Sequence, residues 1–264
     1  MGTLVCFHAH PDDEAIGTGG VMSRAADEGH RVVLVVATRG EQGEVADGFL
    51  SPGEELWERR VGETHAAAAL LGVNRVEFLD YVDSGMMGEP TNEGPGAFWR
   101  ADVDAAAGRL ADILREEHAD VLTHYDDHGG YGHPDHIQVH RVGSRAGALA
   151  GTPRVFEATL NRDHFNRLRK AAAEMGDMPA EIADQELDES FGVAEADITA
   201  AVDVTPWLDR KRAAMRAHAS QIADDHFMLA MPDLAYAMAF GTEWFIRDGQ
   251  GPGITETDLM AGVP

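Results

Sequence analysis

Short apolar runs alternate with longer, Ala-rich amphipathic stretches along the first 160 residues. The apolar runs predict strands and the amphipathic stretches predict helices. Strands that alternate with helices in this way are typical of an α/β protein, with a parallel sheet covered by helices on both faces. The predicted strands span residues 3–10, 31–38, 76–80, 120–125 and 154–160, and the predicted helices span 15–29, 54–72, 102–118 and 135–150.

The pattern is looser after about residue 162. A helix is expected over 163–175, and another over 206–220 with Thr205 as its N-cap. A last short strand is expected over 241–247, and the acidic segment 171–209, which contains no Lys or Arg, is typical of a solvated surface. We therefore expect one domain that covers the whole chain. Its two parts are a catalytic core over residues 1–160 and a C-terminal elaboration over residues 161–264 that completes the pocket.

Composition and charge limit the class of protein. With 44% hydrophobic residues in 264, the chain can bury a sizeable core. Its formal net charge of −25 disfavours nucleic acid and anionic membranes as partners. No apolar run approaches the roughly 18 residues of a membrane span, and the N-terminus does not resemble a signal peptide. We expect a cytoplasmic protein, whose single Cys6 can form no internal disulfide and whose oligomeric state is not indicated.

The first chemically rich motif, HAHPDDE, comes directly at the end of a predicted strand. Ligands bind outside the carboxyl ends of strands in sheets of this kind. His10 and Asp13 are three residues apart across a proline-fixed turn, a spacing that lets an imidazole and a carboxylate bind one cation. Asp12 then lies beside the metal without ligating it, where a carboxylate is suitably placed to act as a general base. Alternatively, Asp12 or Asp13 only caps the following helix.

The second motif, HYDDHGGYGHPDH, also follows a predicted strand. Catalytic zinc usually has three protein ligands and one open position, so a third ligand is needed. His133 and His136 are both candidates, and the one that does not ligate can stabilise a tetrahedral intermediate or protonate the leaving amine. Asp135 lies between them and is placed to orient one imidazole. Tyr131 follows two glycines, on a loop that we expect to face the site.

Together, HAHPDDE and YGHPDH resemble the PIG-L/LmbE family of metal-dependent N-deacetylases. The resemblance covers about residues 3–160, with a further similarity near 210–221. It implies a Rossmann-like fold and a hydrolase that acts on linear amide bonds, releasing acetate from an amino sugar such as an N-acetylglucosaminyl compound.

The resemblance also implies roles for single residues. Zinc would be held by His10, Asp13 and His136, with Asp12 as the base. A second group would act around the reacting carbonyl: His133 as acid or stabiliser of the transition state, Tyr131 near the oxyanion, and Asp135 in support of an imidazole. The residues implied in substrate binding are Arg60, Asp83, Glu44 and His218.

Other functions share these residues. Two histidines and one carboxylate also suit Fe²⁺, so iron is an alternative cofactor to Zn²⁺ in the cell. An amidase that cleaves mycothiol S-conjugates would use the same catalytic groups with a different pocket. A non-catalytic metal- or sugar-binding protein of the same fold is the third alternative. In each case the partner is a small molecule, an amino sugar or an acylated amine.

Overall fold

A seven-stranded sheet runs through the part of the chain that the structure, a computed structural model, describes, residues 1–175 and 185–263. The strand order is β3-β2-β1-β4-β5-β7-β6. The first five strands in this order are parallel, and β7 is antiparallel to both of its neighbours. The strands are β1 (Thr3–His8), β2 (Arg31–Thr38), β3 (Arg75–Tyr81), β4 (Val121–Tyr125), β5 (Arg154–Thr159), β6 (Ala200–Asp203) and β7 (Thr242–Arg247).

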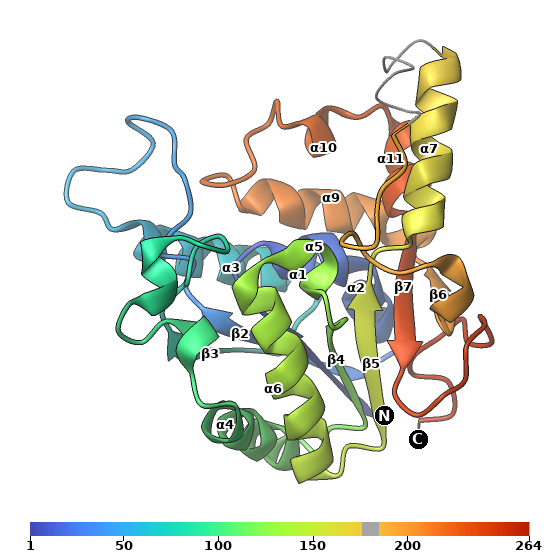
Figure 1. Cartoon of the computed structure of the whole chain (residues 1–264), viewed down its shortest axis with the longest axis horizontal. Coiled ribbons are helices and arrows are strands. Elements are labelled where there is room, and N and C mark those ends of the chain that lie inside the picture. The colour runs from blue at the N-terminus through green and yellow to red at the C-terminus, as the bar shows by residue number, and fades with distance from the viewer. Residues whose placement is uncertain (176–184, 264) are drawn as a thin grey trace.

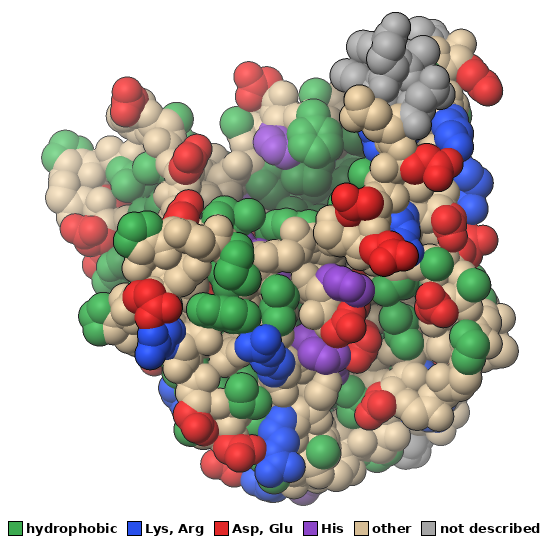
Figure 2. All heavy atoms as spheres, viewed as in Figure 1, with side chains coloured by type: hydrophobic (Ala, Val, Ile, Leu, Met, Phe, Trp, Pro, Cys, Tyr) green, Lys and Arg blue, Asp and Glu red, His purple; other side chains and the backbone are tan. Residues whose placement is uncertain are grey.

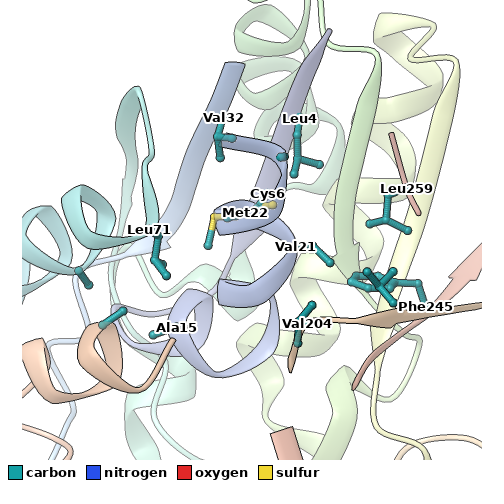
Figure 3. Packing of buried hydrophobic residues seen from close by; sticks show 14 of the residues in the cluster. Leu4, Cys6, Ala15, Val21, Met22, Val32, Leu71, Val204, Phe245 and Leu259 are labelled. Carbon is teal, nitrogen blue, oxygen red and sulfur yellow. The ribbon is translucent and has the colours of Figure 1, made fainter. Parts of the chain in front are cut away.

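Helices cover both faces of the sheet, as the alternating pattern predicts (Figure 1). Alternate residues of a strand point to opposite faces, so Val5 and Phe7 pack against α4 and α6, while Leu4 and Cys6 pack against α2, α3 and α9 (Figure 3). The helices are α1 (Asp13–Gly17), α2 (Gly19–Asp27), α3 (Leu56–Leu71), α4 (Val103–Glu116), α5 (Gly129–Gly132), α6 (Pro134–Ala150), α7 (Arg162–Met175), α9 (Leu208–Ala217), α10 (Phe227–Ala230) and α11 (Asp233–Phe240).

The sheet extends beyond residue 160, because β7 and β6 add to its β5 edge. Part of the acidic segment 171–209, residues 176–184, lies outside the described residues. Acidic side chains are scattered over the face shown in Figure 2, in keeping with the net charge of −25. Within the described residues, no helix combines the length and the apolar character that crossing a membrane requires.

Two of the expected helices differ from those in the structure. One is interrupted, and the other begins later than expected. The helix expected over 15–29 is interrupted at Thr18, whose hydroxyl lies 2.8 Å from Nε2 of the buried His8 and whose backbone leaves the helical region. Thr205 does not cap the helix expected over 206–220. Instead its own N–H donates to Asp203 at 2.9 Å, a short 3₁₀ turn follows, and α9 begins only at Leu208.

The second half of the interrupted helix, α2, lies very close to the C-terminal region. The backbone N–H groups of Gly20 and Val21 both donate to the buried carboxylate of Glu243 on β7, at 2.8 Å each. A Cβ atom at Gly20 would lie 2.3 Å from Val204, a fully buried side chain. The absence of a side chain at this position therefore lets α2 dock against the residues that follow β6.

We predict that Gly20→Ala destabilises the protein, because overpacking a close contact costs about 1–3 kcal/mol. The matched control is Gly108→Ala in α4, where an added Cβ meets no atom within 4 Å. That change should stabilise by about 0.5–1 kcal/mol through helix propensity. Denaturant unfolding measures both variants. Equal stability changes for the two would contradict the close packing of α2.

Candidate metal and hydrolase site

The candidate site lies where two neighbouring strands end. The strands β1 and β4 are adjacent, and the chain continues from β1 toward β2 but from β4 toward β5. Open α/β sheets bind ligands at such a switch point, outside the carboxyl ends of the strands. The HPDDE segment follows β1 and the GGYGHPDH segment follows β4, so the two motifs meet at this point.

Three donor atoms from these segments form a nearly equilateral triangle. Nδ1 of His10 lies 3.4 Å from Oδ2 of Asp13, Nε2 of His136 lies 3.4 Å from the same oxygen, and the two nitrogens are 3.3 Å apart. Donor atoms bound at 2.0–2.1 Å in a tetrahedral zinc site are about 3.3–3.4 Å apart. The triangle therefore fits one face of a tetrahedral cation site, with a fourth position left for a small ligand.

The other ring nitrogens fix the orientation of the two imidazoles. Nδ1 of His136 lies 3.1 Å from the carbonyl oxygen of Gly129, and Nε2 of His10 lies 3.2 Å from Oδ2 of Asp135. An N–H directed at each of these oxygens leaves the lone pair of the opposite nitrogen directed at the triangle, the usual arrangement around a bound metal. Gly129 permits this contact, since its φ is +62° and a Cβ there would lie 2.4 Å from Cβ of His136.

The carboxylate of Asp135 thus contacts a different imidazole from the two that flank it in the sequence. Its carboxylate meets His10, and it also accepts the N–H of Ser84 at 2.9 Å. Its backbone N–H donates to Nδ1 of His133 at 3.1 Å. His133 therefore carries its proton on Nε2 when neutral. Burial, followed by the nearby His10 and His136, lowers the pKa of His133 to about 4.

Asp12 lines the same pocket and has a strained backbone. Its φ of 103° is unfavourable for a residue other than glycine, at a cost of about 1–3 kcal/mol. Although Asp12 precedes α1, its side chain makes no capping hydrogen bond, so the simple capping role does not account for it. Burial raises the pKa of Asp12 to about 6, against the opposing effect of Arg60.

Arg60 holds the turn that contains Asp12. The guanidinium is 4% exposed and donates to the carbonyl oxygens of Pro11 at 2.5 Å and Gly40 at 2.8 Å. The same group lies 3.3 Å from Oδ2 of Asp12. Arg60 lines the pocket, but most of its bonding capacity is directed at the protein itself.

The other residues predicted to bind substrate differ in position. Glu44 is exposed and lines the pocket. Asp83 also lines it, while accepting the backbone N–H groups of Gln42 and Gly85. His218 is fully buried behind Glu14 and is not part of the pocket lining.

Tyr131 lies at the entrance of the site. It is 51% exposed, and its ring centroid is 5.0 Å from that of His136. Gly130 and Gly132 on either side both have positive φ values, 74° and 92°, which glycine adopts without strain. The hydroxyl is thus carried on a turn at the rim of the pocket, as expected for a loop that faces the site.

Several functional contacts were not predicted from the sequence. Glu14 accepts the N–H of Asp12 and is bonded to His218, 204 positions away. His8 and Tyr125 form a buried pair at 2.7 Å beneath the site. The motif HPDDE contains Glu14 and so marks it as a candidate, but no spacing rule connects it with residue 218. The pocket lining also includes Gln42, Met86 and Glu89, which were not predicted as site residues.

Fold and site together define a class, Rossmann-like α/β proteins with a buried histidine–carboxylate site that can hold a cation. Residues 5–147 match the model of the family described as PIG-L: GlcNAc-PI de-N-acetylase. The chain is 41% identical to the 1D-myo-inositol 2-acetamido-2-deoxy-alpha-D-glucopyranoside deacetylase of Acidothermus cellulolyticus, over 99% of this chain and 95% of that one. The chain belongs to the PIG-L family, which confirms the resemblance seen in its two motifs.

Solved structures agree with this fold. The N,N'-diacetylchitobiose deacetylase of Pyrococcus horikoshii superposes with a TM-score of 0.62 at 25% identity, covering 93% of this chain and 83% of the other. The 4-carboxy-2-hydroxymuconate hydratase of Pseudomonas putida superposes with a TM-score of 0.57 at 20% identity, covering 97% and 99%. The second likeness shows the fold alone, so the reaction has to be argued from the site.

Strand β5 carries a carboxyl group, that of Glu157, whose surroundings disfavour the charged form. Glu157 is largely buried, and its carboxylate lies 3.4 Å from Nδ1 of His140. Burial raises the pKa of Glu157 to about 7, and the nearby Asp126, Asp127 and Asp248 act in the same direction. Above that pH the folded protein has to hold the charged carboxylate among like charges.

We predict that Glu157→Gln changes the stability of the protein more favourably at pH 8 than at pH 4. The pKa of Glu157 is about 7 in the folded state against 4.5 for the free side chain. Between these values the folded state binds more protons than the unfolded state, so wild-type stability falls as pH rises. A glutamine does not titrate and avoids this loss. Thermal melts at both pH values measure the difference, and a constant difference would contradict the raised pKa.

Proposed function

We propose that the protein hydrolyses the N-acetyl amide of an N-acetylglucosaminyl compound and releases acetate and a free amine. The observation that carries this proposal is the triangle of His10, Asp13 and His136 with an unligated Asp12 beside it, in one pocket. The family and the near full-length relatives support the reaction, since they are named as deacetylases.

The substrate class is taken from the same relatives. Two of them, 41% and 42% identical to this chain, are named 1D-myo-inositol 2-acetamido-2-deoxy-alpha-D-glucopyranoside deacetylases. We propose the same kind of substrate here, an N-acetylglucosaminyl group joined to inositol. The exposed carboxylate of Glu44 and that of Asp83 line the pocket, where they can accept hydrogen bonds from sugar hydroxyls.

The proposed cofactor is a zinc ion held by His10, Asp13 and His136, with Fe²⁺ as the alternative that the same donors accept. The 3.3–3.4 Å separations of the donor atoms support a tetrahedral cation of this size. When bound, such a cation polarises the amide carbonyl and lowers the pKa of water at the site.

The chain's own residues supply the proton transfers. Asp12, an ionisable carboxylate in the pocket, takes the proton from the water that attacks the carbonyl carbon. His133, with its Nδ1 occupied by the Asp135 N–H, offers its Nε2–H to the developing oxyanion, and the Tyr131 hydroxyl can add a second donor. The proton on Asp12 then passes to the departing amine nitrogen. As this C–N bond breaks, the carbonyl of acetate re-forms.

The proposal is tested by incubating the metal-loaded protein with N-acetylglucosaminyl-inositol and measuring the primary amine with fluorescamine and the acetate separately. Equal amounts of the two products are expected. Turnover only of thiol-conjugated amides would instead favour the amidase, and binding of substrate without any product would favour a non-catalytic protein.

Asp12→Asn should lower kcat by roughly 10²–10⁴-fold, the usual contribution of a general base. Asparagine keeps the size of the side chain but cannot accept a proton, so the metal content should stay at the wild-type level. Steady-state kinetics and elemental analysis of the same preparation measure the two effects. A variant with wild-type kcat would show that another group is the base.

His136→Ala should lose the bound metal, since it removes one corner of the donor triangle. His65→Ala is the control, because His65 is an exposed histidine on α3, outside the pocket lining. Elemental analysis after gel filtration should find about one metal per chain in the control and little in His136→Ala. Full occupancy in His136→Ala would remove this residue from the ligand set.

A further inference from the structure

Three hydrogen bonds join the C-terminal segment 218–221 to helices α1 and α3 of the α/β core. Nε2 of His218 lies 2.5 Å from Oε1 of Glu14 on α1. Ser220 donates its backbone N–H and its hydroxyl to Glu63 on α3, at 2.9 and 2.6 Å. One of these three contacts, that with Glu14, leads directly to the residue proposed as the base.

Glu14 bridges the C-terminal segment and the turn before α1. Its Oε2 accepts the backbone N–H of Asp12 at 2.9 Å, while its Oε1 meets His218. The side chains of Glu14 and His218 are both 0% exposed. If Glu14 only joined α1 to α9, one carboxylate oxygen bonded to His218 would be sufficient. Its other oxygen is bonded to the N–H of Asp12.

Among the described residues, the imidazole of His218 forms a hydrogen bond only with Glu14. Its other ring nitrogen, Nδ1, is buried and has no hydrogen-bond partner among the described residues. The ring is therefore held by a single strong hydrogen bond to Glu14. A buried carboxylate without a side-chain partner is strongly unfavourable, so His218, together with the Asp12 N–H, stabilises a charged Glu14 at this place.

Asp12 needs such support because its backbone has a φ of 103°. Conformations of this kind persist only where the surroundings hold them. Arg60 holds the preceding carbonyl, that of Pro11, and Glu14 holds the N–H of Asp12 itself. A relaxed backbone would turn the Asp12 carboxylate in another direction, although His10 and Asp13 keep their mutual hydrogen bond.

We propose that Glu14, anchored by His218, is a positioning residue that keeps Asp12 in the conformation required of the base. The inference rests on the proposed function, in which Asp12 takes the proton. His218 thereby acts on the reaction through Glu14 and Asp12, without touching the substrate.

Two variants of Glu14 separate its hydrogen bond from its charge. Glu14→Ala removes the acceptor, and kcat should fall about 10²-fold, the loss that a misplacement of about 1 Å can cause, with KM and metal content nearly unchanged. Glu14→Gln keeps an oxygen for the Asp12 N–H, while its amide N–H can donate to Nε2 of His218 after the ring changes tautomer. This variant should keep kcat within about threefold of the wild type, since its geometry is preserved.

The pair is then tested as a double-mutant cycle. His218→Ala alone leaves the buried Glu14 carboxylate without its side-chain partner and should lower kcat. The double variant Glu14→Gln/His218→Ala carries no such charge and should be more active than His218→Ala. The control is Ser220→Ala, in the same buried segment but without contact to Asp12. It should lower the melting temperature and leave kcat unchanged.

A crystal structure of Glu14→Ala gives a readout that does not depend on turnover, and Asp12 is expected there with a negative φ. A positive φ in that structure, or a wild-type kcat in Glu14→Ala, would overturn the inference. Loss of the metal together with activity would also overturn it, because the effect would then be collapse of the whole site. If the wild-type protein itself does not deacetylate, the proposed function fails, and the φ of Asp12 still tests the role of Glu14.

Discussion

Three donor atoms, His10 Nδ1, Asp13 Oδ2 and His136 Nε2, lie 3.3–3.4 Å apart at the end of the sheet. Without a cation, two imidazole lone pairs and a carboxylate would face one another at unfavourably short range, since acceptors do not bond to acceptors. The arrangement is held instead from behind, by Gly129 and Asp135 on the opposite ring nitrogens. The hydrogen bonds around the triangle thus fix the donors in the arrangement that binding requires.

The parallel pairing of β1 with β4 makes this convergence possible. The pairs Leu4–Val121 and Cys6–Thr123 set the register, so both strands end at the same level of the sheet. Every residue of both strands is buried, as expected for strands covered on both faces. The core that holds the two strands in register therefore also sets the distance between the two loops of the candidate site.

Periodicity was sufficient to predict the α/β class, the five parallel strands and most helices, because buried strands and amphipathic helices leave regular patterns. It missed β6, whose four residues Ala200–Asp203 are too few for a pattern. It also joined α1 and α2, because the break at Thr18 depends on His8, a tertiary contact. Competition between a local helix tendency and a buried hydrogen bond cannot be evaluated from neighbouring residues alone.

At the candidate site too, residues within one sequence motif could be predicted, whereas contacts between distant segments could not. The two motifs indicated the donors and Asp12, because a strand end concentrates the residues that share one ligand. The pairing of the Asp135 carboxylate with His10, and not with a neighbouring histidine, depends on how two loops fold over each other. His218 was assigned to the substrate on its resemblance, whereas it is fully buried behind Glu14, which in turn contacts Asp12.

The contact between Glu14 and His218 also joins the first motif to the C-terminal region. The strained Asp12 turn belongs to the first 20 residues, yet one of its two supports ends on residue 218. Helix α2 likewise has its first N–H groups on Glu243, whose charge is matched by the buried Lys211 at 2.5 Å. Since buried carboxylates of this kind are stable only with their partners, removal of the C-terminal region would leave Glu14 without His218. It would also leave the N–H groups of Gly20 and Val21 without their acceptor. The C-terminal region therefore contributes to the chemistry through the backbone of the first motif, although its own residues in these contacts remain outside the pocket.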